Sequence, residues 1–275
     1  MALIKDIDDR QMPLLDHLIE LRNRLMYSCA ALLVGFLICY FFADDIYAFL
    51  VRPLAEIYEG EEGRRMIYTG LTEAFFTYLK VAFWAGAFLS FPFIAMQLWM
   101  FIAPGLYRNE KQAFLPFLVA TPVLFFAGGA MVYYFIFPLA WRFFVSFETP
   151  GGEGMLPIEL EARVGEYLSL VMKLIFAFGL CFQLPVALTL MGRVGLITSQ
   201  QLARNRKFAI VAVFMVAAVL TPPDIISQIG LGLPIIALYE ISIIAVRIVE
   251  KRRAAAEAAE EAAEAGGGTE LDPGR

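Results

Sequence analysis

The sequence has few of the side chains that carry enzyme chemistry. Its 275 residues include three cysteines and one histidine, and charged residues make up 18% of them. The cysteines all lie inside apolar runs and form no CxxC spacing, so we expect neither a disulfide nor a metal site. The HExxH, GxSxG and P-loop motifs are absent, and a lone histidine has no partner base. We therefore expect no catalytic site, no cofactor and no nucleic-acid partner, and we predict that the protein is not an enzyme.

Apolar residues dominate instead, at 60% of the chain with 25 Phe and a mean hydropathy of +0.67. Soluble domains contain about 45–50% apolar residues, and several runs here reach the roughly 20 residues that cross a bilayer. We predict an all-α polytopic membrane protein with a membrane domain over residues 25–247. Its six transmembrane helices are expected at residues 25–42, 73–101, 113–137, 166–191, 208–220 and 229–246, the last two short.

The placement of Lys and Arg predicts the orientation of these spans. Of 22 such residues, 15 fall in the N-terminal segment, in residues 102–112, in residues 192–207 and in the tail. Cytoplasmic loops are enriched in Lys and Arg, so we predict that both termini are cytoplasmic. A re-entrant hairpin remains an alternative for the short last pair. Nothing at the N-terminus has the pattern of a cleavable signal peptide, and the Ala/Glu-rich tail (residues 248–275) is predicted to be a helix that frays into disorder.

Residues 13–25 combine an apolar stripe with a polar edge, which predicts an amphipathic N-terminal helix that leads into the first span. The stripe has helical spacing and consists of Leu14, Leu18, Leu21 and Leu25. His17, Glu20 and Arg24 share the neighbouring stripe, and Glu20 precedes Arg24 by four residues, the favourable order for an ion pair. His17 is either an interfacial residue at the helix edge or a neighbour of a binding site.

Glu20 and Glu110 are acids in otherwise basic segments, and the predicted topology puts both at the cytoplasmic face. Two carboxylates there can each accept a bidentate guanidinium, more strongly in a partly dry interface. The alternative is that each is a surface acid paired with a nearby Arg or Lys. Within the spans, Gln97 and Gln183 more often indicate interhelical hydrogen bonds than a substrate site.

Two other classes of function are weighed on the same residues. A six-span transporter of small solutes would usually show repeated halves and broken helices at matching positions, and no such repeat is present. An intramembrane enzyme would have to use His17, which lies outside the hydrocarbon.

Three stretches carry a resemblance to a known family: residues 13–25 (PLLDHLIELRNRL), residues 97–110 (QLWMFIAPGLYRNE) and residues 220–228 (LTPPDIISQ). They resemble motifs of the TatC subunits of twin-arginine translocases, and weaker similarity, including Pro53, extends over residues 12–250. The resemblance implies a receptor in the bacterial cytoplasmic (inner) membrane that binds Arg-Arg signal peptides of folded cargo. It also implies single-span TatA- and TatB-like partners in a multimeric complex, and transport driven by the proton-motive force.

The family resemblance assigns roles to individual residues. It implies that Glu20 and Glu110 receive the twin arginines, and the remaining residues of the expected signal-peptide site are Leu21, Arg22, Phe101, Leu106 and Tyr107. Pro53 and Asp224 match positions of the outer loops. Gln97 and Gln183 are expected to make polar contacts within the membrane. Gln183 departs from the family pattern, which often has Glu there, so a role that needs ionisation is not expected at this position.

Overall fold

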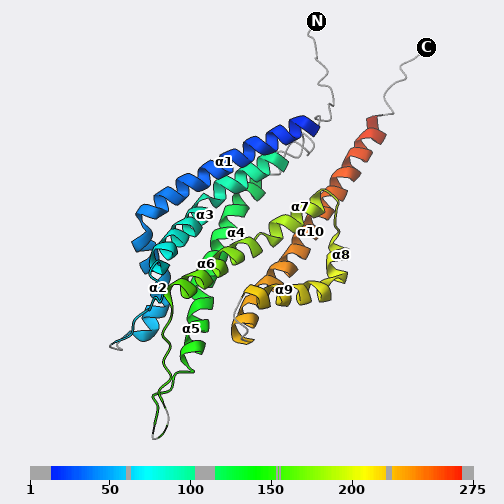
Figure 1. The fold of residues 1–275 in the computed structure, drawn as a ribbon. Coiled ribbons are helices and arrows are strands. Elements are labelled where there is room, and N and C mark those ends of the chain that lie inside the picture. Colours follow the sequence, from blue (N-terminus) through cyan, green and yellow to red (C-terminus); the bar gives the residue numbers. More distant parts are fainter. Residues whose placement is uncertain are drawn as a thin grey trace, which may run out of the picture. The chain divides into compact units, whose positions relative to one another are not determined.

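The computed structural model describes residues 14–59, 63–102, 115–152, 154, 156–220 and 225–267. Most of these residues are helical, and two isolated β-bridges join loop segments. In chain order (Figure 1), the α-helices of this part are α1 (Leu14–Phe41), α2 (Ala43–Ala55), α3 (Glu73–Ile102), α4 (Leu115–Met131), α5 (Phe137–Val145), α6 (Val164–Cys181), α7 (Leu184–Arg193), α8 (Ser199–Arg204), α9 (Arg206–Leu220) and α10 (Ile225–Gly267). A 3₁₀ turn, η1 (Glu56–Tyr58), follows α2, and a π-helical segment, η4 (Val132–Ile136), joins α4 to α5.

Five helical stretches of the described part are long and apolar enough to cross a membrane. They are Leu15–Phe41, Glu73–Phe101, Pro116–Val145, Val164–Arg193 and Gln228–Ala256. An all-α fold with several membrane-length helices is thus confirmed. The expected fifth span corresponds to α9, whose 15 residues extend over only about 22 Å of a hydrocarbon core about 30 Å thick. The number of six spans stays a prediction.

Two segments differ from the sequence prediction. The stretch between the first two expected spans begins with a helix, α2, because Asp44 and Asp45 lie in its first turn, where acidic side chains are favourable. The last helix is not short, because α10 runs for 43 residues through the Ala- and Glu-rich part of the tail. Ala and Glu are strong helix formers, so the helix expected at the start of the tail extends as far as Gly267.

Prolines interrupt two of the membrane-length stretches. The π-helical segment η4 ends one residue before Phe137-Pro138, and α6 gives way to α7 at Phe182 and Gln183, just before Pro185. Proline has no N–H to donate and clashes with the carbonyl four residues earlier, so the preceding turn must change its hydrogen bonding. The interruptions before Pro138 and Pro185 have this origin.

The chain forms two compact units. The first contains residues Met1–Phe49 and Ala74–Pro122, and in it α1 and α3 lie side by side (Figure 1). The two backbones nearly touch where Gly86 faces Gly35: a Cβ added to Gly86 would lie 2.5 Å from the Phe36 nitrogen. One turn further along α3, the Ser90 hydroxyl donates to the Ala31 carbonyl of α1 at 2.9 Å. Small residues therefore fix how closely these helices pack.

The second unit contains residues Leu50–Glu73 and Val123–Arg275. Gly128 of α4 lies against the backbone of α6, since a Cβ there would be 2.7 Å from the Phe178 carbonyl oxygen. Trp141 of α5 stacks on Phe137 and packs against Tyr167 of α6, at centroid separations of 5.4 and 5.3 Å. Further along the chain, α10 packs against α7 and α9. Helix packing and aromatic contacts together form the core of this unit.

Candidate functional site

Glu20 lies in the second turn of α1 and is ion-paired within that helix. Its Oε1 accepts a hydrogen bond from Nη2 of Arg24 at 3.2 Å, and the two side chains are 20% and 29% exposed. The spacing of four residues predicted this pair. It is also the pairing expected by the alternative interpretation, in which Glu20 is a surface acid with a basic neighbour. No hydrogen bond to Oε2 of Glu20 is made by any described residue.

Arg24 also connects the site to α3. Its Nη1 donates to Oε1 of Gln97 at 3.2 Å and contacts Sδ of Met100 at 3.5 Å. Gln97 is buried, with 5% of its surface exposed, and its hydrogen bond crosses from α3 to α1. The guanidinium of Arg24 therefore donates one hydrogen bond to Glu20 of its own helix and another to Gln97 of α3. Sequence reasoning chose Glu20 and Gln97 separately, and it did not foresee that Arg24 joins them.

His17 and Phe101 stack on each other at the same end of α1 and α3. Their ring centroids are 4.4 Å apart and the planes differ by 19°. His17 precedes Glu20 by one helical turn, so the stacked rings lie next to the Glu20–Arg24 pair along α1. Phe101 therefore lies next to this pair through its contact with His17, a residue whose role the sequence left open.

The surface around Glu20 is hollowed along α1. The hollow is lined by Asp16, Ile19, Glu20, Asn23, Arg24 and Tyr27. Leu21 and Arg22 are exposed, and Arg22 donates to the Oδ1 of Asn23 at 3.3 Å. A cation that approaches this hollow meets the Glu20 carboxylate, of which one oxygen is already bonded to Arg24, and the carboxylate of Asp16.

Four predicted site residues lie outside the described residues: Leu106, Tyr107, Glu110 and Asp224. Pro53 is buried within α2. Gln183 is half-buried at the junction of α6 and α7, where its carbonyl accepts from the N–H of Ala187. No group of three or more His, Cys, Asp and Glu side chains that could hold a metal ion occurs in the part of the chain that the structure describes.

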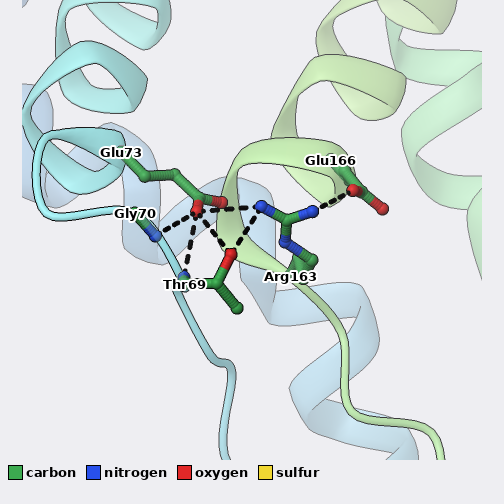
Figure 2. Close-up of polar contacts among 5 residues, drawn as sticks. All are labelled: Thr69, Gly70, Glu73, Arg163 and Glu166. Atoms are coloured by element: carbon green, nitrogen blue, oxygen red, sulfur yellow. Dashed lines mark hydrogen bonds and ion pairs between the residues drawn. The ribbon is translucent and has the colours of Figure 1, made fainter.

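A second polar cluster, which the sequence did not predict, joins two loops of the second unit (Figure 2). Oε2 of Glu73 accepts from the N–H groups of Thr69 and Gly70 at 3.0 and 3.2 Å, and from Nη2 of Arg163 at 3.1 Å. Arg163 also donates to the Thr69 hydroxyl and to Glu166, both at 2.7 Å. The partners are about 90 residues apart, so no local spacing could have revealed the cluster.

Glu148 anchors the same two loops a short way along. Its carboxylate accepts hydrogen bonds from both terminal nitrogens of Arg64, at 3.0 and 2.7 Å. It also accepts hydrogen bonds from the Tyr58 hydroxyl and the Leu160 N–H. Burial opposes its ionisation, but the Leu160 N–H, the Arg64 guanidinium and the Tyr58 hydroxyl together hold the pKa of Glu148 below its usual value. In both clusters the charged side chains pair with one another, although Nε of Arg163 is buried without a hydrogen-bond partner among the described residues.

Comparison with known proteins assigns the family. Residues 16–234 match the family model for the Sec-independent protein translocase protein (TatC). Over 254 residues the chain is 52% identical to the TatC protein of Magnetococcus marinus, a match that covers 92% of this chain and 91% of that one. The chain belongs to the TatC family. It is also 39% identical to TatC of Escherichia coli over 237 residues, which cover 86% of this chain and 88% of the relative.

A solved structure agrees with this assignment. The crystal structure of a twin-arginine translocase receptor, TatC, matches the fold with a TM-score of 0.72 at 35% identity, covering 85% of this chain and 99% of that one. The resemblance drawn from the three motifs is thereby confirmed. TatC proteins are translocase components and not enzymes, which rules out the intramembrane enzyme and the small-solute transporter. With its five apolar helices, this TatC-family chain is a multi-pass membrane protein.

Proposed function

We propose that this chain is the receptor of a twin-arginine translocase and binds the Arg-Arg pair of a signal peptide through Glu20 and Glu110. The observation that carries the proposal is the state of Glu20. Its partly buried carboxylate already holds one guanidinium, that of Arg24, and its second oxygen receives no hydrogen bond from the described residues. A carboxylate offers about four lone-pair sites and suits the fork of an arginine. The described residues beside it, His17 and Phe101, provide an aromatic surface.

The test is the affinity of a fluorescent Arg-Arg signal peptide for the full chain in lipid nanodiscs. A hydrogen bond to a charged group contributes about 1.5–3 kcal/mol, so Glu20→Ala and Glu110→Ala should each raise Kd about 10- to 100-fold. Glu56→Ala is a matched control, because Glu56 of η1 forms an ion pair at the same spacing of four residues with Arg52 of α2, at 2.8 Å. The proposal fails if both variants bind as tightly as the control.

We further propose that both termini face the cytoplasm of a bacterial inner membrane, as the Lys and Arg distribution predicts. A cysteine at position 224, in a background where Cys29, Cys39 and Cys181 are replaced by Ala, should then react with a membrane-impermeant maleimide added outside intact cells. Labelling only after lysis would instead indicate that the last two helices form a re-entrant pair.

The proposed complex includes single-span TatA- and TatB-like subunits, with the proton-motive force as the source of energy. Gln183 is the candidate contact, since it lies half-buried where α6 is interrupted, and amide side chains within spans form interhelical hydrogen bonds. Gln97 is a poorer candidate than the sequence indicated, because its amide oxygen is buried against Arg24. Co-purification of tagged partner subunits should fall with Gln183→Leu and persist with Thr189→Ala, a buried polar residue of α7.

A further inference from the structure

Arg24 presents to Glu20 the chemical group that the proposed ligand would present. Its guanidinium binds Oε1 of Glu20 within α1, and both side chains are largely withdrawn from water. The pair is therefore less screened than a typical exposed pair at this spacing. A second guanidinium that approaches Glu20 must share the carboxylate with Arg24 or displace it.

Gln97 gives Arg24 another acceptor. While Nη2 of Arg24 binds Glu20, Nη1 is held on α3 by the buried amide oxygen of Gln97, with Sδ of Met100 beside it. A guanidinium carries five N–H donors, so it can stay bonded to α3 after it releases the carboxylate. Without such an acceptor the released charge would lie unpaired in a partly buried place, which is costly.

We propose that Arg24 is a resident competitor for the Glu20 carboxylate, and that Gln97 retains the Arg24 guanidinium when an arginine of a signal peptide binds Glu20. This inference rests on the proposed function, because it takes Glu20 as the acceptor of the signal peptide. Arg24 and Gln97 are then positioning residues that set the selectivity of the site. An incoming group must outcompete a guanidinium, which the fork of arginine can do and the point charge of lysine does less well.

The first measurement uses Arg24→Gln in the full chain in nanodiscs, with synthetic signal peptides that carry Arg-Arg or Lys-Lys. Removing the competitor should lower Kd for the Arg-Arg peptide about three- to tenfold and reduce the preference over Lys-Lys. Arg24→Lys keeps the competing charge, so its Kd should stay within about twofold of wild type. Tighter binding by both variants would mean that any loosening at position 24 helps, and would overturn the competition.

The second measurement removes the retaining acceptor. Gln97→Met keeps a side chain of similar volume without the amide, so Arg24 should be held on Glu20 and Kd should rise about three- to tenfold. In the double variant Arg24→Gln/Gln97→Met nothing remains to be retained, and the Gln97 substitution should have no effect on Kd. Ser90→Ala is the control, because Ser90 also bonds α3 to α1 but does not contact Arg24. An equal rise in Kd from Gln97→Met in both backgrounds would contradict the inference.

Glu20→Ala separates this inference from the proposed function. If Glu20→Ala leaves binding unchanged, Glu20 is not the receptor carboxylate and both ideas fall. If Glu20→Ala weakens binding while Arg24→Gln does not strengthen it, the receptor site stands and only the competition is refuted. Thermal unfolding of each variant in the same nanodiscs gives the folded fraction by which each Kd is corrected.

Discussion

Gly86→Ala tests the contact that holds α1 against α3. A Cβ at residue 86 would lie 2.5 Å from the nitrogen and 2.7 Å from the Cα of Phe36, and 2.8 Å from the carbonyl carbon of Gly35. All three atoms belong to backbone, so no side chain can rotate away to make room. Ordinary contacts of a Cβ begin at 3.4 Å, and the two helices must therefore separate by about 1 Å at this point.

Three effects set the size of the loss. Overpacking at a close contact costs about 1–3 kcal/mol. The separation also lengthens the bond from Ser90 to the Ala31 carbonyl, now 2.9 Å, and an interhelical hydrogen bond in a membrane contributes about 0.6 kcal/mol. Replacing Gly by Ala in a helix returns up to about 1 kcal/mol of propensity. The net expectation is a destabilisation of about 1–3 kcal/mol.

The assay is thermal unfolding of the purified protein in detergent. At about 2–4 °C per kcal/mol for a chain of this size, Tm should fall by about 2–12 °C. Gly230→Ala in α10 is the control, since a Cβ there would lie 3.6 Å from the end of the Ile136 side chain, an ordinary contact. Gly230→Ala should leave Tm unchanged or raise it. If Gly86→Ala is as stable as Gly230→Ala, the close packing of α1 on α3 is not as described.

Three further predictions concern the loops and the tail. The pKa of Glu148 in the folded protein lies below its ordinary value of 4.5. The ionised Glu148 therefore stabilises the fold above pH 4.5, and this stabilisation is lost as the pH falls through the pKa of the folded state. In Glu148→Gln and in Arg64→Gln, Tm should fall less steeply than in wild type on acidification below about pH 4.5. Arg163→Ala removes the bonds from Arg163 to Thr69, Glu73 and Glu166, so limited proteolysis should cut the loop around Thr69 faster than in wild type. Ser199→Ala removes the 2.5 Å hydrogen bond from the Ser199 hydroxyl to the Glu250 carboxylate of α10, and Tm should fall by about 2–4 °C.

Helices were predictable from the sequence where a long apolar run is bounded on both sides by polar or helix-breaking residues. The second span was expected at residues 73–101, and α3 is Glu73–Ile102. The helix α2 was not predicted, because it lies between the first two apolar runs; Asp44 and Asp45 follow the first run directly and suit the first turn of a new helix. The interruption of the fourth span was not predicted, although Pro185 lies just after it and the missing N–H of this proline acts on the residues just before it.

The candidate site was predictable only within one helix. The pairing of Glu20 with Arg24 follows from a spacing of four residues. The contact between Arg24 and Gln97 joins residues 73 positions apart, and it depends on how closely α1 and α3 pack at two glycines. No periodicity encodes that approach, so the sequence identified Gln97 as polar and intramembrane without its partner.

The Glu20–Arg24 pair also bears on how the charge of a receptor carboxylate is balanced near a membrane when no ligand is bound. A partly buried carboxylate with no partner would lose hydration without gaining a compensating bond. Arg24 compensates the charge in the resting state. In the proposed receptor, binding is then an exchange of one guanidinium for another, and its free energy is the small difference between two similar bonds. A small difference gives moderate affinity and easy release, which suits a receptor that must pass its cargo on.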